Sequence, residues 1–184
     1  MPGVNRASRV IAESTRQYRK SLALKCIFLS HQKADREVCK EIANYIISAD
    51  VDVYFDEYDN DLKDALQTNN PQGVTEAICK GINNSSHMLC IISPNTLASR
   101  WVPFEVGYGF DKTHLGVLTL KGIPDKDLPD YLKTAKILIR GTKSLNQYLA
   151  TITNASVPIL ESRGAIKSHN AVGHQLDNYL DWNL

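Results

Sequence analysis

Short apolar segments alternate with amphipathic segments along this chain from residue 25 onward. Five segments are nearly continuous apolar runs, as expected for strands buried on both faces of a sheet: 25–30, 51–55, 87–93, 115–120 and 136–140. The segments between them repeat apolar residues at helical spacing. Alternating strands and helices of this kind predict an α/β fold, with a five-stranded parallel sheet covered by helices on both faces.

Three helices can be placed from their apolar faces. The helix over residues 35–49 presents Val38, Ile42, Tyr45, Ile46 and Ala49. The next begins at Pro71, a favoured first-turn residue, and buries Val74, Ala77, Ile78 and Ile82. The closing helix is marked by Leu145, Tyr148, Leu149 and Ile152. Residues 56–70 are polar and predict a long loop.

The chain ends differ from this central part, so we expect a domain over residues 24–152 between an arm (1–23) and a C-terminal extension (153–184). Residues 1–22 carry a charge of +4, whereas the whole chain carries +1. Helical spacing of Ile11, Thr15, Tyr18 and Leu22 predicts a basic helical arm; an organelle transit peptide is the alternative. Residues 153–184 show no clear period.

Composition removes several classes of function. A net charge of +1 predicts no general affinity for nucleic acid or membranes, and no apolar run approaches the 18 residues of a membrane span. The four cysteines lack CxxC spacing and the five histidines are scattered. We therefore expect buried reduced thiols in a cytoplasmic protein and no metal site. The thiols are Cys26, Cys39, Cys79 and Cys90.

Known phosphate-binding motifs are also missing. Neither GxxxxGK[ST] nor a GxGxxG after the first strand occurs, which argues against P-loop NTPases and Rossmann dehydrogenases. A phosphoryl-receiver domain needs an aspartate at the end of the third strand, where this chain has Ser93. In a parallel sheet, ligands bind beyond the carboxyl ends of the strands. The residues that follow the strands are therefore candidates: Ser30, His31, Asp56, Glu57 and Ser93.

Several segments in the same order resemble one family. "IFLSHQKAD" (27–35) is similar to the first strand and turn of a TIR (Toll/interleukin-1 receptor) domain. "VDVYFDEYD" (51–59) resembles the second strand of that family. Residues 81–105 resemble its third strand, followed by Ser-Pro and a Trp-x-x-x-Glu signature made here by Trp101 and Glu105. The resemblance covers roughly residues 24–152 and implies the flavodoxin-like TIR fold.

The resemblance also implies a site. Some bacterial TIR domains cleave NAD⁺ at the nicotinamide–ribose bond, and Glu105 matches their catalytic glutamate. Pro103 places Glu105 near a helix N-terminus, where the macrodipole favours an ionised carboxylate. Acidic residues also occupy first turns for stability alone, so both interpretations stand.

Five further residues are candidates for binding the nucleotide: Phe28, Ser30, His31, Asp56 and Trp101. Each has an alternative. Ser30 is equally suited to cap a helix, Asp56 to a solvated turn, and Trp101 to a core anchor. Gly107 and Gly109 interrupt the expected helix at a cost of about 1 kcal/mol each relative to alanine, either for close packing or to shorten it.

As function we expect an NAD⁺ glycohydrolase or cyclase that releases nicotinamide and either ADP-ribose or a cyclic isomer. NAD⁺ is then the substrate, and no cofactor is implied. The chain resembles antiphage TIR proteins of the Thoeris kind, which implies a homo-oligomer and a separate effector that senses the product. The alternatives are a non-catalytic TIR scaffold and a nucleoside deoxyribosyltransferase.

Overall fold

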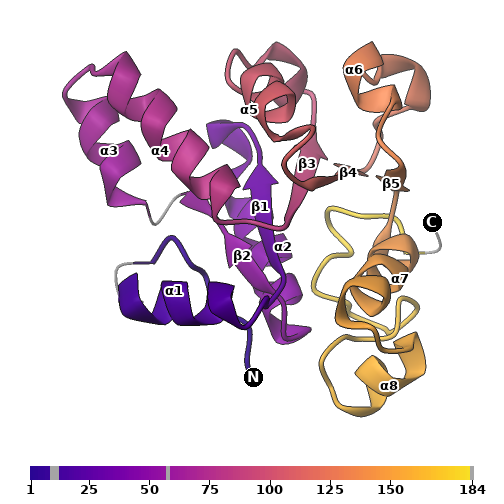
Figure 1. Ribbon diagram of the computed structural model, residues 1–184. Helices are drawn as coiled ribbons and strands as arrows, with labels where there is room; N and C mark the ends of the chain where they lie inside the picture. Colours follow the sequence, from indigo (N-terminus) through magenta and orange to yellow (C-terminus); the bar gives the residue numbers. More distant parts are fainter. Residues whose placement is uncertain (9–12, 57–58, 183–184) are drawn as a thin grey trace.

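A five-stranded parallel sheet forms the centre of the protein (Figure 1). The computed structural model describes residues 1–8, 13–56 and 59–182. The sheet order is β2-β1-β3-β4-β5, and every neighbouring pair is parallel. The strands are β1 (Cys26–Ser30), β2 (Asp52–Tyr54), β3 (His87–Ile92), β4 (His114–Thr119) and β5 (Ile137–Ile139). The predicted fold class is confirmed.

Each face of the sheet carries its own hydrophobic core. Ile27 and Leu29 of β1 point toward α2 (Arg36–Ser48) and α7 (Thr142–Thr153). Cys26 and Phe28 point the other way, toward α4 (Pro71–Asn83) and α5 (Val102–Gly109). Successive side chains of a strand point to opposite faces of the sheet. When helices cover both faces, the odd and the even positions of the strand must therefore both be apolar. This explains the continuous apolar runs.

The predicted helix faces are buried. The apolar residues expected on α2, α4 and α7 are all 9% exposed or less. Pro71 is the first residue of α4, and the Asn70 side chain before it accepts a 3.0 Å hydrogen bond from the Gly73 amide. α2, α4 and α7 are therefore confirmed.

The predicted loop over residues 56–70 is wrong. Residues Asn60–Gln67 form the helix α3, which packs against α4. The Asp59 side chain caps it by accepting a 3.3 Å hydrogen bond from the Leu62 amide. Leu62 and Ala65 are buried on one side. A cap followed by two apolar residues three apart is enough for a short helix when a neighbouring helix covers them.

The basic N-terminal segment contains the expected helix, α1 (Glu13–Ser21), but not the expected packing. Tyr18 and Leu22 are 56% and 45% exposed, whereas Arg19 is buried. Ile11 lies outside the described residues. The apolar spacing therefore did not identify the face that docks onto the domain.

Buried charge holds this segment instead. Asp52, at the start of β2, accepts hydrogen bonds from Arg6 Nε at 2.7 Å and from Arg19 Nε at 2.9 Å. The backbone of residues 4–6 pairs with Val53 along the outer edge of β2. The edge strand of the sheet is thus covered by the chain's own N-terminal residues.

The C-terminal residues complete the core on the α2 and α7 side. Leu160, in the short helix α8 (Val157–Ser162), and the later Leu176 and Leu180 are buried with α2 and α7. The Tyr45 hydroxyl of α2 donates a 2.6 Å hydrogen bond to Asn146 of α7. α6 (Asp130–Lys133) completes the helices labelled in Figure 1.

The cysteines are free thiols, of which Cys26, Cys39 and Cys90 are buried and Cys79 is partly buried. Over the described ranges, no helix has the length and apolar character needed to cross a membrane.

Candidate active site at the carboxyl edge of the sheet

Ser30 and Glu105 meet where the strand order reverses. Ser30 is the last residue of β1, and Glu105 lies in the first turn of α5. The Ser30 hydroxyl donates a 2.5 Å hydrogen bond to Glu105 Oε2, and the two residues are 0% and 4% exposed. At this edge, the chain leaves β1 toward α2 on one face of the sheet and leaves β3 toward α5 on the other face. Ligands bind at such a point in open α/β sheets.

Burial changes the ionisation of Glu105. Desolvation raises the pKa of its carboxyl to about 8, and the Asp56 charge adds to this, while the Ser30 hydrogen bond opposes it. The expectation from helix position was an ionised carboxylate. Removal from water therefore outweighs the helix N-terminus, and the environment of Glu105 favours the protonated carboxyl.

Local sequence positions α5 against the sheet. The Ser99 hydroxyl accepts hydrogen bonds of 3.3 Å from the amides of Trp101 and Val102 at the helix start. Near its end, a Cβ on Gly109 would clash with the end of the Met88 side chain of β3. Gly109 thus permits close approach to β3, whereas a Cβ on Gly107 would meet nothing within 4 Å.

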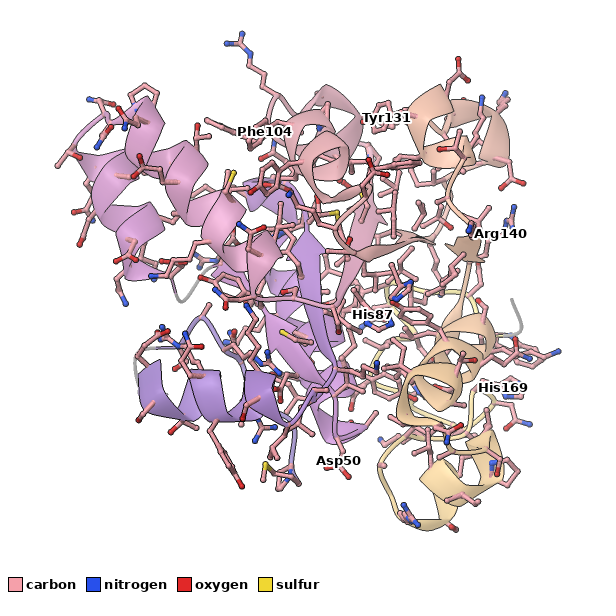
Figure 2. The ribbon with its side chains drawn as sticks, viewed as in Figure 1. Asp50, His87, Phe104, Tyr131, Arg140 and His169 are labelled. Atoms are coloured by element: carbon pink, nitrogen blue, oxygen red, sulfur yellow. The ribbon has the colours of Figure 1, made fainter. Side chains whose placement is uncertain are left out.

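Trp101 lies at the exposed start of α5. Its side chain is 39% exposed, so it is not a core anchor. Its ring lies edge-on to Phe104 with centroids 6.0 Å apart, and Phe104 stacks on Tyr108. Figure 2 labels Phe104 on this helix. These rings form an aromatic surface along α5, the helix that also carries Glu105.

His31 and Asp56 lie at the neighbouring strand ends. His31 Nδ1 is 3.0 Å from the Leu29 carbonyl, and because a carbonyl oxygen only accepts, Nδ1 is the donor in this hydrogen bond. Its Nε2 is 3.7 Å from Asp56 Oδ1, and its ring packs on Phe55 with centroids 5.1 Å apart. Glu57, the other acidic candidate, lies outside the described residues.

Phe28 is placed differently from the expectation. It is 1% exposed, and its ring stacks on Tyr54 with centroids 6.0 Å apart. A Cβ on Gly81 of α4 would lie 2.9 Å from this ring. In this structure Phe28 therefore supports the site from within the core and presents no surface to a ligand, because alternation turns it inward beneath α4.

Comparison with known protein families identifies the family to which this fold belongs. The family model described as the TIR domain matches residues 27–144. The chain belongs to the TIR-domain family. Among solved structures, a metazoan TIR-STING receptor from C. gigas is similar in fold, with a TM-score of 0.50 at 21% sequence identity. That match covers 71% of this chain and 40% of the receptor chain. No curated protein matches.

The TIR domain also contains a polar network around Ser93, which the sequence analysis named as a candidate because it follows the third strand. Asp35, at the start of α2, accepts hydrogen bonds from the Ser93 hydroxyl at 2.5 Å and from Asn95 Nδ2 at 2.7 Å. The Thr96 amide donates to the Ser93 hydroxyl at 3.1 Å. This network ties the loop after β3 to the segment after β1. The position of Ser93 after the third strand was the signal in the sequence, whereas its partners Asp35 and Asn95 were not expected.

Cys90 is the other buried neighbour that the sequence did not single out. It pairs in register with Ser30 across β1 and β3. Burial raises the pKa of its thiol to about 12, and the nearby Glu105 charge adds to this. Cys90 therefore places an uncharged, apolar side chain beside the Ser30–Glu105 pair.

The described residues contain no group of three or more side chains suited to hold a metal ion.

Proposed function

We propose that this TIR domain cleaves NAD⁺ at the nicotinamide–ribose bond with Glu105 as the catalytic carboxylate. The observation that carries the proposal is the buried 2.5 Å hydrogen bond between Ser30 and Glu105 at the switch point of the sheet. A carboxyl group with a strongly shifted pKa at the carboxyl edge of the sheet is typical of a functional group. The TIR family includes NAD-cleaving members.

The chemistry requires one carboxylate. The bond between ribose C1′ and the pyridinium nitrogen breaks, and its electron pair leaves with nicotinamide as a neutral molecule, so no general acid is needed. Positive charge then develops on the ribose. An ionised Glu105 at about 4 Å stabilises it by roughly 4 kcal/mol at an effective dielectric of 20. This corresponds to about a thousandfold in rate.

The substrate itself promotes ionisation of Glu105. The nicotinamide ring of NAD⁺ is cationic, and a nearby positive charge lowers the pKa of a carboxyl group. The Ser30 hydroxyl acts in the same direction, because its hydrogen bond favours the charged form. Glu105 is 4% exposed, so the surrounding segments must move to admit the ribose. We assign the ligand contacts beside it to Ser30, His31, Asp56 and Trp101.

Capture of the ribose cation decides the product. Water gives ADP-ribose and a proton, whereas an adenine nitrogen or a ribose hydroxyl of the same molecule gives a cyclic isomer.

We propose that the product serves as a signal for a separate effector in bacterial antiphage defence. TIR domains generally self-associate, and we propose a homo-oligomer here. Specific activity should then fall on dilution; constancy well below about 1 μM would contradict this.

A non-catalytic TIR scaffold is the second candidate. The observation in its favour is that Glu105 is buried and hydrogen-bonded to Ser30, as a structural carboxyl would be. A scaffold needs self-association but has no use for an ionised Glu105. The two functions therefore differ in what a Glu105→Gln substitution changes.

The deciding experiment incubates concentrated protein with NAD⁺ and a crowding agent, and separates products by liquid chromatography and mass spectrometry. Glu105→Gln is run beside Glu76→Gln, an exposed glutamate on α4. Nicotinamide release that Glu105→Gln abolishes and Glu76→Gln retains supports catalysis. If light scattering shows assembled protein that releases no nicotinamide, the catalytic proposal fails and the scaffold function stands.

A further inference from the structure

A hollow lies at the amino edge of the sheet, opposite the Ser30–Glu105 pair. Its volume is about 580 Å³, which is within the range of small-molecule sites. It lies between the first residues of the strands and the second half of α7. β3 runs from this hollow, at His87, toward the carboxyl edge beyond Ile92, so the two sites are separated by the length of a strand.

Basic side chains line the hollow in the order of the strands. Lys25 directly precedes β1, His87 and His114 are the first residues of β3 and β4, and Lys136 directly precedes β5. These four strands are consecutive in the sheet. Within the described part of the chain, no acidic residue lines the hollow, and neither lysine ammonium makes an ion pair. The two lysines supply uncompensated positive charge, which favours an anion, whereas burial lowers the pKa of His87 to about 4 and makes its ring a neutral hydrogen-bonding group.

One wall of the hollow contains a hydroxyl without a partner. Tyr148 of α7 is 5% exposed, and its hydroxyl has no hydrogen-bond partner among the described residues. Buried polar groups are rarely left unsatisfied, so such a group indicates a missing water or ligand atom. Burial raises the pKa of Tyr148, so the group remains a neutral donor.

His87 connects the wall to the basic row. It is 8% exposed, and its ring lies 6.4 Å from that of Tyr148 and 5.0 Å from that of His114. The Ser86 hydroxyl is 2.9 Å from its Nδ1, which fixes the ring orientation. Figure 2 labels His87 in the interior of the molecule.

The remaining surface is apolar. Ile137 and Ile139 of β5 line the hollow from the sheet and Ile152 lines it from α7, whereas the Leu138 side chain packs in the core on the opposite face. Ile137 is only partly buried, so a molecule with an aromatic or aliphatic part would cover it, whereas a bare inorganic ion would not.

We propose that this hollow binds a small organic phosphate, with its phosphate against Lys25, Lys136 and the two histidines and its apolar part against β5 and α7. The Tyr148 hydroxyl donates to the ligand. This site is separate from the proposed NAD⁺ site, and its test does not depend on NAD⁺ cleavage.

Phenyl phosphate is a suitable probe, with phenol and inorganic phosphate as its two halves. The imidazole signals of His87 and His114 are followed by NMR in the full chain during titration at constant pH, to about 10 mM, where millimolar affinity approaches saturation. Saturable shifts with phenyl phosphate, and at least about tenfold weaker binding of either half, support the proposal. No shift, or equal binding of phenol or of inorganic phosphate, overturns it.

A pair of double variants tests the basic row. Lys25→Met/Lys136→Met removes two exposed charges at the hollow, and Lys63→Met/Lys126→Met removes two exposed charges elsewhere. We expect about tenfold or more weaker binding in the first variant and unchanged binding in the second. An equal loss in both, or a loss in neither, contradicts the assignment.

Tyr148→Phe should keep the fold and weaken binding severalfold. Unchanged affinity would exclude the Tyr148 hydroxyl as a ligand contact.

Discussion

The carboxyl of Glu105 and the hydroxyl of Ser30 lie 2.5 Å apart, although 75 positions separate the residues in the chain. The pair is buried at the carboxyl edge of the sheet, beside the uncharged Cys90. Burial favours the protonated acid, and the Ser30 hydrogen bond opposes this by favouring the carboxylate. Stability and proposed activity should therefore both depend on pH through Glu105.

Glu105→Gln should stabilise the protein at alkaline pH. The ordinary pKa of 4.5 applies to the unfolded chain, and burial raises the folded pKa to about 8. Between these values the folded protein keeps a proton that the unfolded chain has lost, so stability falls as pH rises through this window. Glutamine has no such dependence. We expect equal stability near pH 4 and a gain of several kcal/mol, up to about 5 kcal/mol, at pH 9.

Urea denaturation at several pH values measures this effect. Glu76→Gln, on the exposed face of α4, should follow the wild-type curve at every pH. A Glu105→Gln curve parallel to the wild type across the window would show that Glu105 is not held protonated.

Ser30→Ala should move the pH–rate profile of the proposed NAD⁺ cleavage. Loss of the hydrogen bond removes the contribution that lowers the pKa of Glu105, so the rising limb of kcat/KM shifts to higher pH. At pH 7 we expect a loss of roughly tenfold, which recovers as pH rises. The measurement is nicotinamide release from pH 6 to 10, with Ser162→Ala as the control. A loss of equal size at every pH would mean that Ser30 does not act through ionisation.

Asp52→Asn should destabilise the fold strongly. Asp52 is 1% exposed and neutralises the buried Arg6 and Arg19, which its removal leaves without a counter-charge. We expect a loss of about 3–5 kcal/mol in the free energy of unfolding, measured by urea denaturation. Asp125→Ala breaks an exposed pair with Arg140 and should change little. Equal, small effects would show that the N-terminal segment is not anchored by charge.

Two glycine substitutions should have opposite effects. A Cβ on Gly81 would lie 2.6 Å from the Tyr54 ring and 2.9 Å from the Phe28 ring, so Gly81→Ala should cost about 1–3 kcal/mol. Gly107 faces open space within α5, so Gly107→Ala should stabilise by up to about 1 kcal/mol through helix propensity. Thermal melting distinguishes the two. A destabilising Gly107→Ala would mean that α5 needs this glycine for another reason.

Much of the fold could be predicted from local pattern. The apolar faces of α2, α4 and α7 and the five strands follow from repeats of 3.6 and from continuous apolar runs, which depend only on near neighbours. The helix α3 was missed although Asp59, Leu62 and Ala65 carried the signal, because two apolar residues are too few to stand out among polar ones. The TIR family was identified from motifs in the right order, and the family match confirms it.

The sequence by itself determined the strands, the main helices and the family of this protein, because these depend on patterns of adjacent residues. Only the tertiary structure decided which charges are buried. It joined Arg6 and Arg19 to Asp52, turned Phe28 into the core, and covered Glu105 so that its pKa rises. Desolvation and partners distant in sequence set these properties, and neither can be read from spacing along the chain.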